Sequence, residues 1–334
     1  MSDLERNLIR DVTSGHAVSL ERGLLIVSGL STEQEIHRYV VKLNEIHHGF
    51  IERLKTKSPL GLSETRKYLI TFLARSLFEH LWNTKPKRCN GAFLLTEVVD
   101  AQLNPDIDRT VGSCVGLTSL YTVLGLRENL NLTIMMSGSH ILNRLTVDDM
   151  VTNIDNTDPL GFDCAIEERT FSEHEPAKLL ANVINSRGML HERLGRFESA
   201  EEDYGKAIAI NPEYSNAYNN RGNMRAKRTD YSRAIKDYTR AIELNGGFVE
   251  AYSNRGMAKE NMGDYHGAIT DFNTAVELNP GYSDGYFRRA RVRHLLKDYA
   301  GALSDLDQVI QLDPESRDKV AHFKVRIASL RQNT

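Results

Sequence analysis

The sequence predicts an α+β domain followed by an all-α solenoid of helical repeats. The first observation is a 34-residue unit that occurs four times without a gap over residues 182–317. The second is the N-terminal stretch, residues 1–170, in which helical patterns come first and strand-like patterns follow. A last helical pattern lies in residues 318–334. We therefore predict three parts with these bounds.

The 34-residue period produces columns of equivalent residues. Two columns hold small residues, where helices of one unit are expected to cross, and two hold mainly aromatic residues that fill the space between units. The small columns are Gly188, Gly222, Gly256 and Ala290, and Ala200, Ala234, Ala268 and Ala302. The aromatic columns are Phe197, Tyr231, Tyr265 and Tyr299, and Tyr204, Tyr238, Phe272 and Leu306. This pattern resembles the tetratricopeptide repeat, in which stacked neighbours bury the apolar face of each unit.

Characteristic residues also mark the helix ends. Gly195 and Gly263 can adopt the positive φ that stops the first helix of a unit. Asn-Pro pairs at 211–212 and 279–280 stop the second helix, because proline cannot continue it. A final capping helix is predicted from apolar Val320, Phe323, Val325, Ile327 and Leu330. The resemblance implies a concave groove, lined by the first helix of each unit, that binds a protein or peptide partner.

Asn223, Asn254 and Arg288 are the candidate peptide-binding residues. Some tetratricopeptide-repeat proteins clamp the C-terminal carboxylate of an acidic peptide with five Lys, Arg and Asn side chains, and the resemblance places these residues at three of the five positions. Asn219 and Asp284 stand where lysine is expected. Because Asp284 repels a carboxylate, the sequence disfavours the full clamp. A basic strip near the groove, or else solvated helix surface, is predicted from Arg187, Arg221, Arg255 and Arg289.

Composition argues against several other classes of protein. A net charge of −3 gives no reason to expect a nucleic-acid partner. No apolar run approaches the roughly 18 residues that suggest a membrane span, and the charged start MSDLERNLIRD is not a signal peptide. The isolated Cys89, Cys114 and Cys164 form neither a disulfide framework nor a zinc site. We therefore expect a cytoplasmic protein without metal or cofactor.

In residues 1–170, helical periodicities precede strand periodicities. Helices are predicted over 31–57, 64–82 and 114–126, and strands over 132–136, 140–145 and 150–154. Ser31 and Gln34 suit a capping box at the start of the first helix. The polar stretch 167–176 is predicted to be the junction with the repeats.

Cys114, His140 and Asp155 form a candidate nucleophilic centre. Cys114 opens the third predicted helix, where peptide N–H groups favour the reactive thiolate. His140 opens the second strand and Asp155 follows the third, so adjacent strands would place an imidazole base beside an orienting carboxylate. Asp148 and Asp149 compete with Asp155 for this last role.

The motifs around these residues resemble the transglutaminase-like, papain-fold superfamily. The closer resemblance is to its SirB-type bacterial branch, which joins such a domain to tetratricopeptide repeats. The matching motifs are GSCVGLTSLYTVLGL, SGSHILNRL and NIDNT, and the resemblance covers roughly residues 30–160. It implies that Cys114 forms a thioester with an amide or peptide carbonyl. It also implies that His140 is the acid and base, and that Asp155 orients His140.

Three functions follow from these features. The first is a thiol enzyme, a cysteine peptidase or transglutaminase-like amide acyltransferase, whose repeats recruit the protein substrate. The second is a non-catalytic adaptor with a degenerate transglutaminase-like domain. Departures from the superfamily pattern leave that alternative open: many active relatives have an aromatic residue where Val115 stands and Ala-Trp where Ile141-Leu142 stand. The third is a regulatory homo-oligomer assembled through the repeats.

Overall fold

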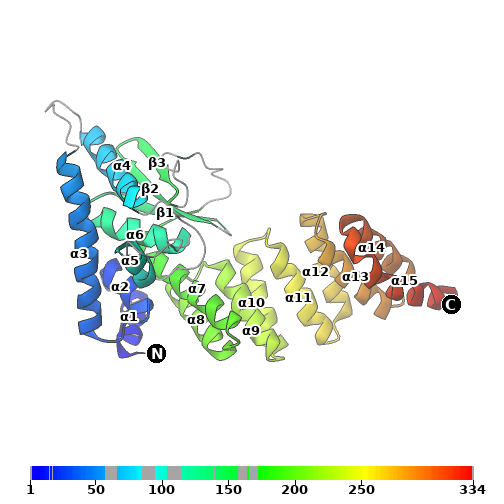
Figure 1. Ribbon diagram of the computed structural model, residues 1–334. Coiled ribbons are helices and arrows are strands. Elements are labelled where there is room, and N and C mark those ends of the chain that lie inside the picture. Colours follow the sequence, from blue (N-terminus) through cyan, green and yellow to red (C-terminus); the bar gives the residue numbers. More distant parts are fainter. Residues whose placement is uncertain are drawn as a thin grey trace. The chain divides into compact units, whose positions relative to one another are not determined.

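The computed structural model consists of two compact units (Figure 1). The N-terminal unit contains residues 1–187 and 209–211, and the repeat array contains residues 188–208 and 212–334. The structure describes residues 2–14, 16, 18–56, 66–84, 95–103, 114–137, 140–156, 164 and 172–332. Within these ranges, every helix is too short or too polar to cross a membrane.

Helices precede the sheet in the N-terminal unit, as predicted. They are α1 (Asp3–Thr13), α2 (Leu20–Val27), α3 (Glu33–Thr56), α4 (Arg66–Thr84), α5 (Leu95–Leu103) and α6 (Cys114–Arg127). The sequence pattern predicts only α3, α4 and α6. A capping box does start α3, but its members are Thr32 and Glu35, one residue beyond the predicted pair. The Glu35 backbone N–H donates to Thr32 Oγ1 at 3.2 Å, and the Thr32 N–H donates to Glu35 Oε2 at 3.0 Å.

An antiparallel sheet with the strand order β3-β2-β1-β4 completes the N-terminal unit. Its strands are β1 (Leu132–Met136), β2 (Ile141–Val147), β3 (Met150–Ile154) and β4 (Ser172–His174). The bounds of β1 and β3 agree with the prediction, whereas β2 begins one residue after His140. The predicted junction over 167–176 contains β4, which pairs with β1 through Ile134 and His174. This unit is therefore α+β.

Helix α6 is the buried helix that carries the candidate nucleophile, and it is covered from Gly116 to Gly125. Apolar residues surround its axis, a pattern typical of a helix packed on all sides. The Tyr121 hydroxyl donates to the Ala74 carbonyl of α4 at 2.9 Å, and burial raises the pKa of this phenol. On the sheet side, Thr118 Oγ1 donates to the Ile141 carbonyl at 3.3 Å. The second turn of α6 is thus fixed to the start of β2.

Pairs of helices form the repeat array. They are α7 (Leu179–Arg193), α8 (Phe197–Ile210), α9 (Ser215–Lys227), α10 (Tyr231–Leu244), α11 (Val249–Asn261), α12 (Tyr265–Leu278), α13 (Ser283–Leu295) and α14 (Tyr299–Leu312), followed by α15 (Arg317–Gln332). The small residues lie where two helices of a repeat approach, as predicted. A Cβ on Gly222 would come within 2.6 Å of Tyr238 Cε1.

The last helix, α15, packs on the end of the solenoid. Val320 and Ile327 are buried in a cluster with Leu306 and Val309. Val325, which the pattern places among the apolar residues of the cap, is 71% exposed. The apolar face of α15 is therefore narrower than the sequence predicts.

Thr229→Gly is expected to raise the free energy of unfolding by about 0.5–1 kcal/mol. The turn between the helices of each repeat has a residue with positive φ, and in the second repeat it is Thr229, with φ of 61°. This conformation is unfavourable for a β-branched residue, whereas Gly195 and Gly263 adopt it with φ of 71° and 83°. The measurement is denaturant unfolding followed by circular dichroism. The reciprocal Gly263→Thr should be less stable, and a loss of stability in Thr229→Gly would contradict the expectation.

Candidate functional site

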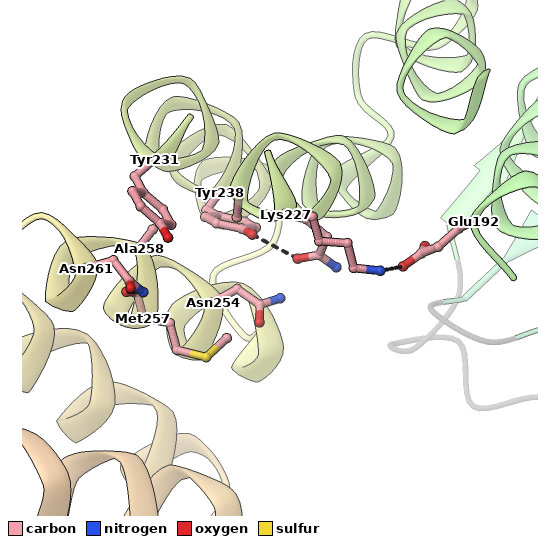
Figure 2. Close-up of a pocket in the computed structure, with 10 residues that line it drawn as sticks. Glu192, Lys227, Tyr231, Tyr238, Asn254, Met257, Ala258 and Asn261 are labelled. Carbon is pink, nitrogen blue, oxygen red and sulfur yellow. Dashed lines mark hydrogen bonds and ion pairs between the residues drawn. The ribbon is translucent and has the colours of Figure 1, made fainter. Parts of the chain in front are cut away.

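A pocket of about 370 Å³ lies on the first helices of the second and third repeats, α9 and α11 (Figure 2). Aromatic residues of α10 close one side of it. Its lining residues are Glu192, Asn223, Ala226, Lys227, Tyr231, Tyr238, Asn254, Met257, Ala258 and Asn261. The first helix of each repeat is the element that the resemblance predicts to line the peptide groove. Asparagine amides and apolar side chains of alanine and methionine both contribute to this surface.

The three candidate peptide-binding residues have different surroundings. Asn223 and Asn254 both line the pocket. The Tyr238 hydroxyl donates to Asn223 Oδ1 at 2.9 Å, and Asn254 Nδ2 donates to Asn219 Oδ1 at 3.0 Å. The Tyr238 phenol is protonated at neutral pH, and burial raises its pKa further, so its hydroxyl donates to the Asn223 amide and fixes the orientation of that amide.

Arg288 is held by an acidic neighbour. Its Nε donates to Asp284 Oδ2 at 2.5 Å, one helical turn earlier, and its Nη1 contacts the sulfur of Met257. Asp284 therefore does more than replace an expected lysine, because its carboxylate also neutralises the guanidinium that would bind a peptide carboxylate. The structure brings Asn223 and Asn254 into one pocket, and connects Arg288 to it through Met257.

Lys227 and Met257 are pocket residues that sequence reasoning missed. Lys227 lies four residues after Asn223, and Met257 lies three residues after Asn254, spacings that put side chains on the same helix face. The Lys227 ammonium is 2.7 Å from Glu192 Oε1, and its side chain is 45% exposed. It also lies 4.9 Å from the centre of the Phe197 ring. Figure 2 shows the ion pair at one end of the pocket.

The predicted basic strip is wrong for the arginines of the last three repeats. Each pairs through two nitrogens with a nearly buried aspartate on the second helix of its own repeat, so its guanidinium is held inside the repeat. The pairs are Arg221 with Asp237, Arg255 with Asp271 and Arg289 with Asp305, at 2.6–3.0 Å. The side chains of these aspartates are only 2–5% exposed. Arg187 instead pairs with Glu5 at 2.6 Å.

The N-terminal unit brings two of the three candidate nucleophilic-centre residues together. His140 Nε2 lies 2.8 Å from Asp155 Oδ2, and the two side chains are 31% and 21% exposed. The backbone around His140 is fixed by Ser137, whose N–H donates to the His140 carbonyl at 2.9 Å and whose Oγ accepts from the His140 N–H at 3.0 Å. Because an ionised carboxylate accepts but cannot donate, Nε2 carries the proton and Nδ1 is the basic nitrogen of the neutral ring.

Cys114 is the first residue of α6, as predicted. Its side chain lies outside the described part of the chain, as do Cys89 and the whole segment from 104 to 113. The link from Thr118 to Ile141 places the second turn of this helix beside the residue that follows His140. This contact therefore fixes the second turn of α6, one turn after Cys114, to the start of β2.

Models of the tetratricopeptide repeat match residues 181–214, 215–247, 249–282 and 284–316. The chain therefore contains four consecutive tetratricopeptide repeats. All of these matches lie within residues 181–316. No curated protein is significantly similar to the chain.

Several solved structures are similar to part of the chain. A crystal structure of MamA is 19% identical, with a TM-score of 0.39, over 41% of this chain and 81% of that one. The first tetratricopeptide-repeat domain of Spaghetti (RPAP3), bound to the HSP90 peptide SRMEEVD, is 23% identical, with a TM-score of 0.34, over 35% of this chain and 92% of that one. The second tetratricopeptide-repeat domain of human RPAP3, in complex with the HSP70 peptide SGPTIEEVD, is 30% identical, with a TM-score of 0.33, over 34% of this chain and 94% of that one.

Proposed function

We propose that the four tetratricopeptide repeats bind an extended segment of a protein partner and that the chain acts as an adaptor. The observation that supports this most directly is the pocket on α9 and α11, which combines asparagine amides with Met257. Solenoid repeats generally use such surfaces for partner binding. The partner is recognised as a protein, since asparagine amides match the donors and acceptors of a peptide main chain.

The charges of this surface favour an internal peptide segment over an acidic C-terminus. Lys227 is paired with Glu192, and Arg288 is paired with Asp284. A peptide carboxylate would have to displace one of these acidic partners, which weakens its binding. Met257, which is flexible and polarisable, suits an apolar side chain of the ligand. The ligand is therefore an extended, uncharged or weakly charged segment with an apolar anchor.

Selection of peptides from a random library displayed on phage tests this proposal. Selected peptides are expected to bind the full chain, and Asn254→Ala and Met257→Ala should each weaken binding about tenfold. Arg240→Ala is a matched control, because Arg240 is exposed on α10 and pairs with Glu243 outside the pocket. Peptides that bind both pocket variants as tightly as the wild type would place recognition elsewhere on the chain.

A second candidate function is thiol chemistry in the N-terminal unit, supported by the 2.8 Å contact between His140 and Asp155. In this proposal the Cys114 thiolate attacks an amide carbonyl carbon, and His140 first takes the thiol proton. The C–N bond then breaks, His140 returns the proton to the leaving amine, and a thioester remains on Cys114. Attack by water or a second amine releases the acyl group. The repeats would recruit the substrate protein.

Alkylation by iodoacetamide against pH, followed at each cysteine by mass spectrometry, separates this candidate from a non-catalytic adaptor. Cys114 is expected to react well below pH 8, faster than Cys89 and Cys164, because a histidine partner stabilises the thiolate. His140→Ala should remove this advantage. If Cys114 reacts no faster than the other two cysteines in the folded chain, the N-terminal unit is a degenerate domain and the adaptor function stands alone.

A further inference from the structure

A hydrogen-bond network of buried polar side chains connects α6 with β2 and with the residues after β3. Asn156 Nδ2 donates to Asn143 Oδ1 at 2.8 Å, and Asn143 Nδ2 donates to Thr122 Oγ1 at 2.7 Å. The Thr122 hydroxyl then donates to the Thr118 carbonyl at 2.6 Å. Thr122 and Asn143 have no solvent exposure, and Asn156 is 2% exposed. Every hydrogen bond in this network has an ordinary length.

The network passes through an apolar layer, where the burial of polar side chains costs free energy. In the sheet register, Asn143 lies opposite Ile134 on one neighbouring strand and Ile154 on the other, and both isoleucines are fully buried. An apolar residue at 143 would match this row. Buried amides contribute little net stability even when they are fully hydrogen-bonded, but they restrict a core to one arrangement. The position of Asn143 therefore indicates that it serves geometry more than stability.

This hydrogen-bond network fixes the positions of His140 and Asp155. Asn156 directly follows Asp155, and Asn143 lies on the strand that His140 precedes. The Thr118 carbonyl is the last acceptor of the network, and the Thr118 hydroxyl donates to the Ile141 carbonyl. The ends of β2 and β3 that carry His140 and Asp155 are thus tied to the same helix.

We infer that Asn143, with Thr122 and Asn156, is a positioning residue that holds the Asp155 carboxylate against His140 Nε2. The contact at 2.8 Å requires the segment after β3 to keep one conformation relative to the start of β2. The Asn143 amide, which bonds to both Asn156 and Thr122, supplies that constraint. The consequence for thiol chemistry rests on the second candidate function, whereas the alignment of His140 and Asp155 does not.

The test is a pH titration of the His140 ring signals by nuclear magnetic resonance in the full chain, assigned by their loss in His140→Gln. Asp155→Asn gives the titration midpoint of an unpaired His140, which should lie below that of the wild type, because a carboxylate stabilises the imidazolium. Asn143→Leu is expected to move the midpoint at least half of the way to this reference. Leu145→Ala, a core truncation on the same strand, should leave it unchanged.

Two further variants keep the inference testable if Asn143→Leu does not fold. Thr122→Val removes the hydroxyl without a change of shape and should lower the midpoint, whereas Thr122→Ser keeps the hydroxyl and should not. A wild-type midpoint in folded Asn143→Leu, or equal midpoints in Thr122→Val and Thr122→Ser, would overturn the positioning role. So would a wild-type midpoint equal to that of Asp155→Asn.

Cys114 alkylation on the same samples separates the two proposals. If Asn143→Leu shifts the His140 midpoint and also slows a fast reaction of Cys114, both proposals are supported. If the shift occurs but Cys114 reacts no faster than Cys164, thiol chemistry is wrong and the positioning role stands. If Cys114 is alkylated fast but the His140 midpoint does not shift in Asn143→Leu, thiol chemistry is supported and the positioning role is wrong.

Discussion

Asp271→Ala is expected to lower the free energy of unfolding of the repeat array by about 3–5 kcal/mol. The side chain of Asp271 is 2% exposed, and its two oxygens accept bonds from Arg255 at 2.7 and 3.0 Å. The Lys259 ammonium lies 2.8 Å from the same carboxylate. Removal of Asp271 leaves two largely buried cations without their counter-ion, and the cost of that uncompensated charge dominates the effect.

The measurement is denaturant unfolding followed by far-ultraviolet circular dichroism, in which the helical repeats dominate. Trp82, the single tryptophan of the chain, lies in α4 and reports the N-terminal unit separately by fluorescence. Asp284→Ala is the control, because its side chain is 46% exposed and its pair with Arg288 should contribute less than about 1 kcal/mol. A loss in Asp271→Ala no larger than that of the control would contradict the expectation.

A triple replacement sharpens this test. Arg255→Met, Lys259→Met and Asp271→Leu together remove all three charges and keep similar volume, so the combined variant should recover most of the stability lost in Asp271→Ala. The alternative is that the ion cluster itself provides the stability, and then the triple variant would be as unstable as the single one. The comparison distinguishes an ion cluster that adds net stability from one in which the loss comes only from leaving buried charges without a partner.

The 34-residue period carries enough information to predict the repeat array, because each residue column has one structural role. Gly263, for example, has the positive φ that its place before the second helix suggests. The prediction for the arginine column fails for a physical reason. The partners of Arg221, Arg255 and Arg289 are aspartates that lie 16 residues later and recur with the same 34-residue step, so the pairing is visible only when both columns are aligned.

The N-terminal unit is harder to predict, because its contacts join distant parts of the sequence. Short strand-like runs bounded by polar or glycine-bearing turns predict β1 and β3 with the observed bounds, and adjacency of strands suggests that His140 and Asp155 meet. The three-residue strand β4 is too short to have a pattern of its own and is defined by its pairing with β1. The buried Asn143 gives no periodic signal, since its role depends on Thr122 of a helix and Asn156 of another segment.

Gly256→Ala is expected to destabilise the third repeat by about 1–3 kcal/mol through overpacking. A Cβ at this position would lie 2.8 Å from Phe272 Cε1 and 3.0 Å from Cζ, and the Phe272 side chain is fully buried. Helix propensity acts in the other direction, because alanine is better than glycine by up to about 1 kcal/mol in a helix interior. The clash should dominate, since the ring is enclosed and cannot move freely. Denaturant unfolding measures the net loss.

The fourth repeat supplies the compensating change. There the small residue is Ala290 and the equivalent of Phe272 is Leu306, and both are buried in one cluster, so this chain already combines alanine with leucine at these two positions. Gly256→Ala combined with Phe272→Leu should therefore be more stable than the sum of the two single losses predicts, by about 1 kcal/mol. Phe272→Leu alone should be destabilising, because it leaves unfilled space beside glycine. Additive losses in the double variant would mean that the two positions are not coupled, and the small-residue column would then reflect backbone conformation instead of packing against the ring.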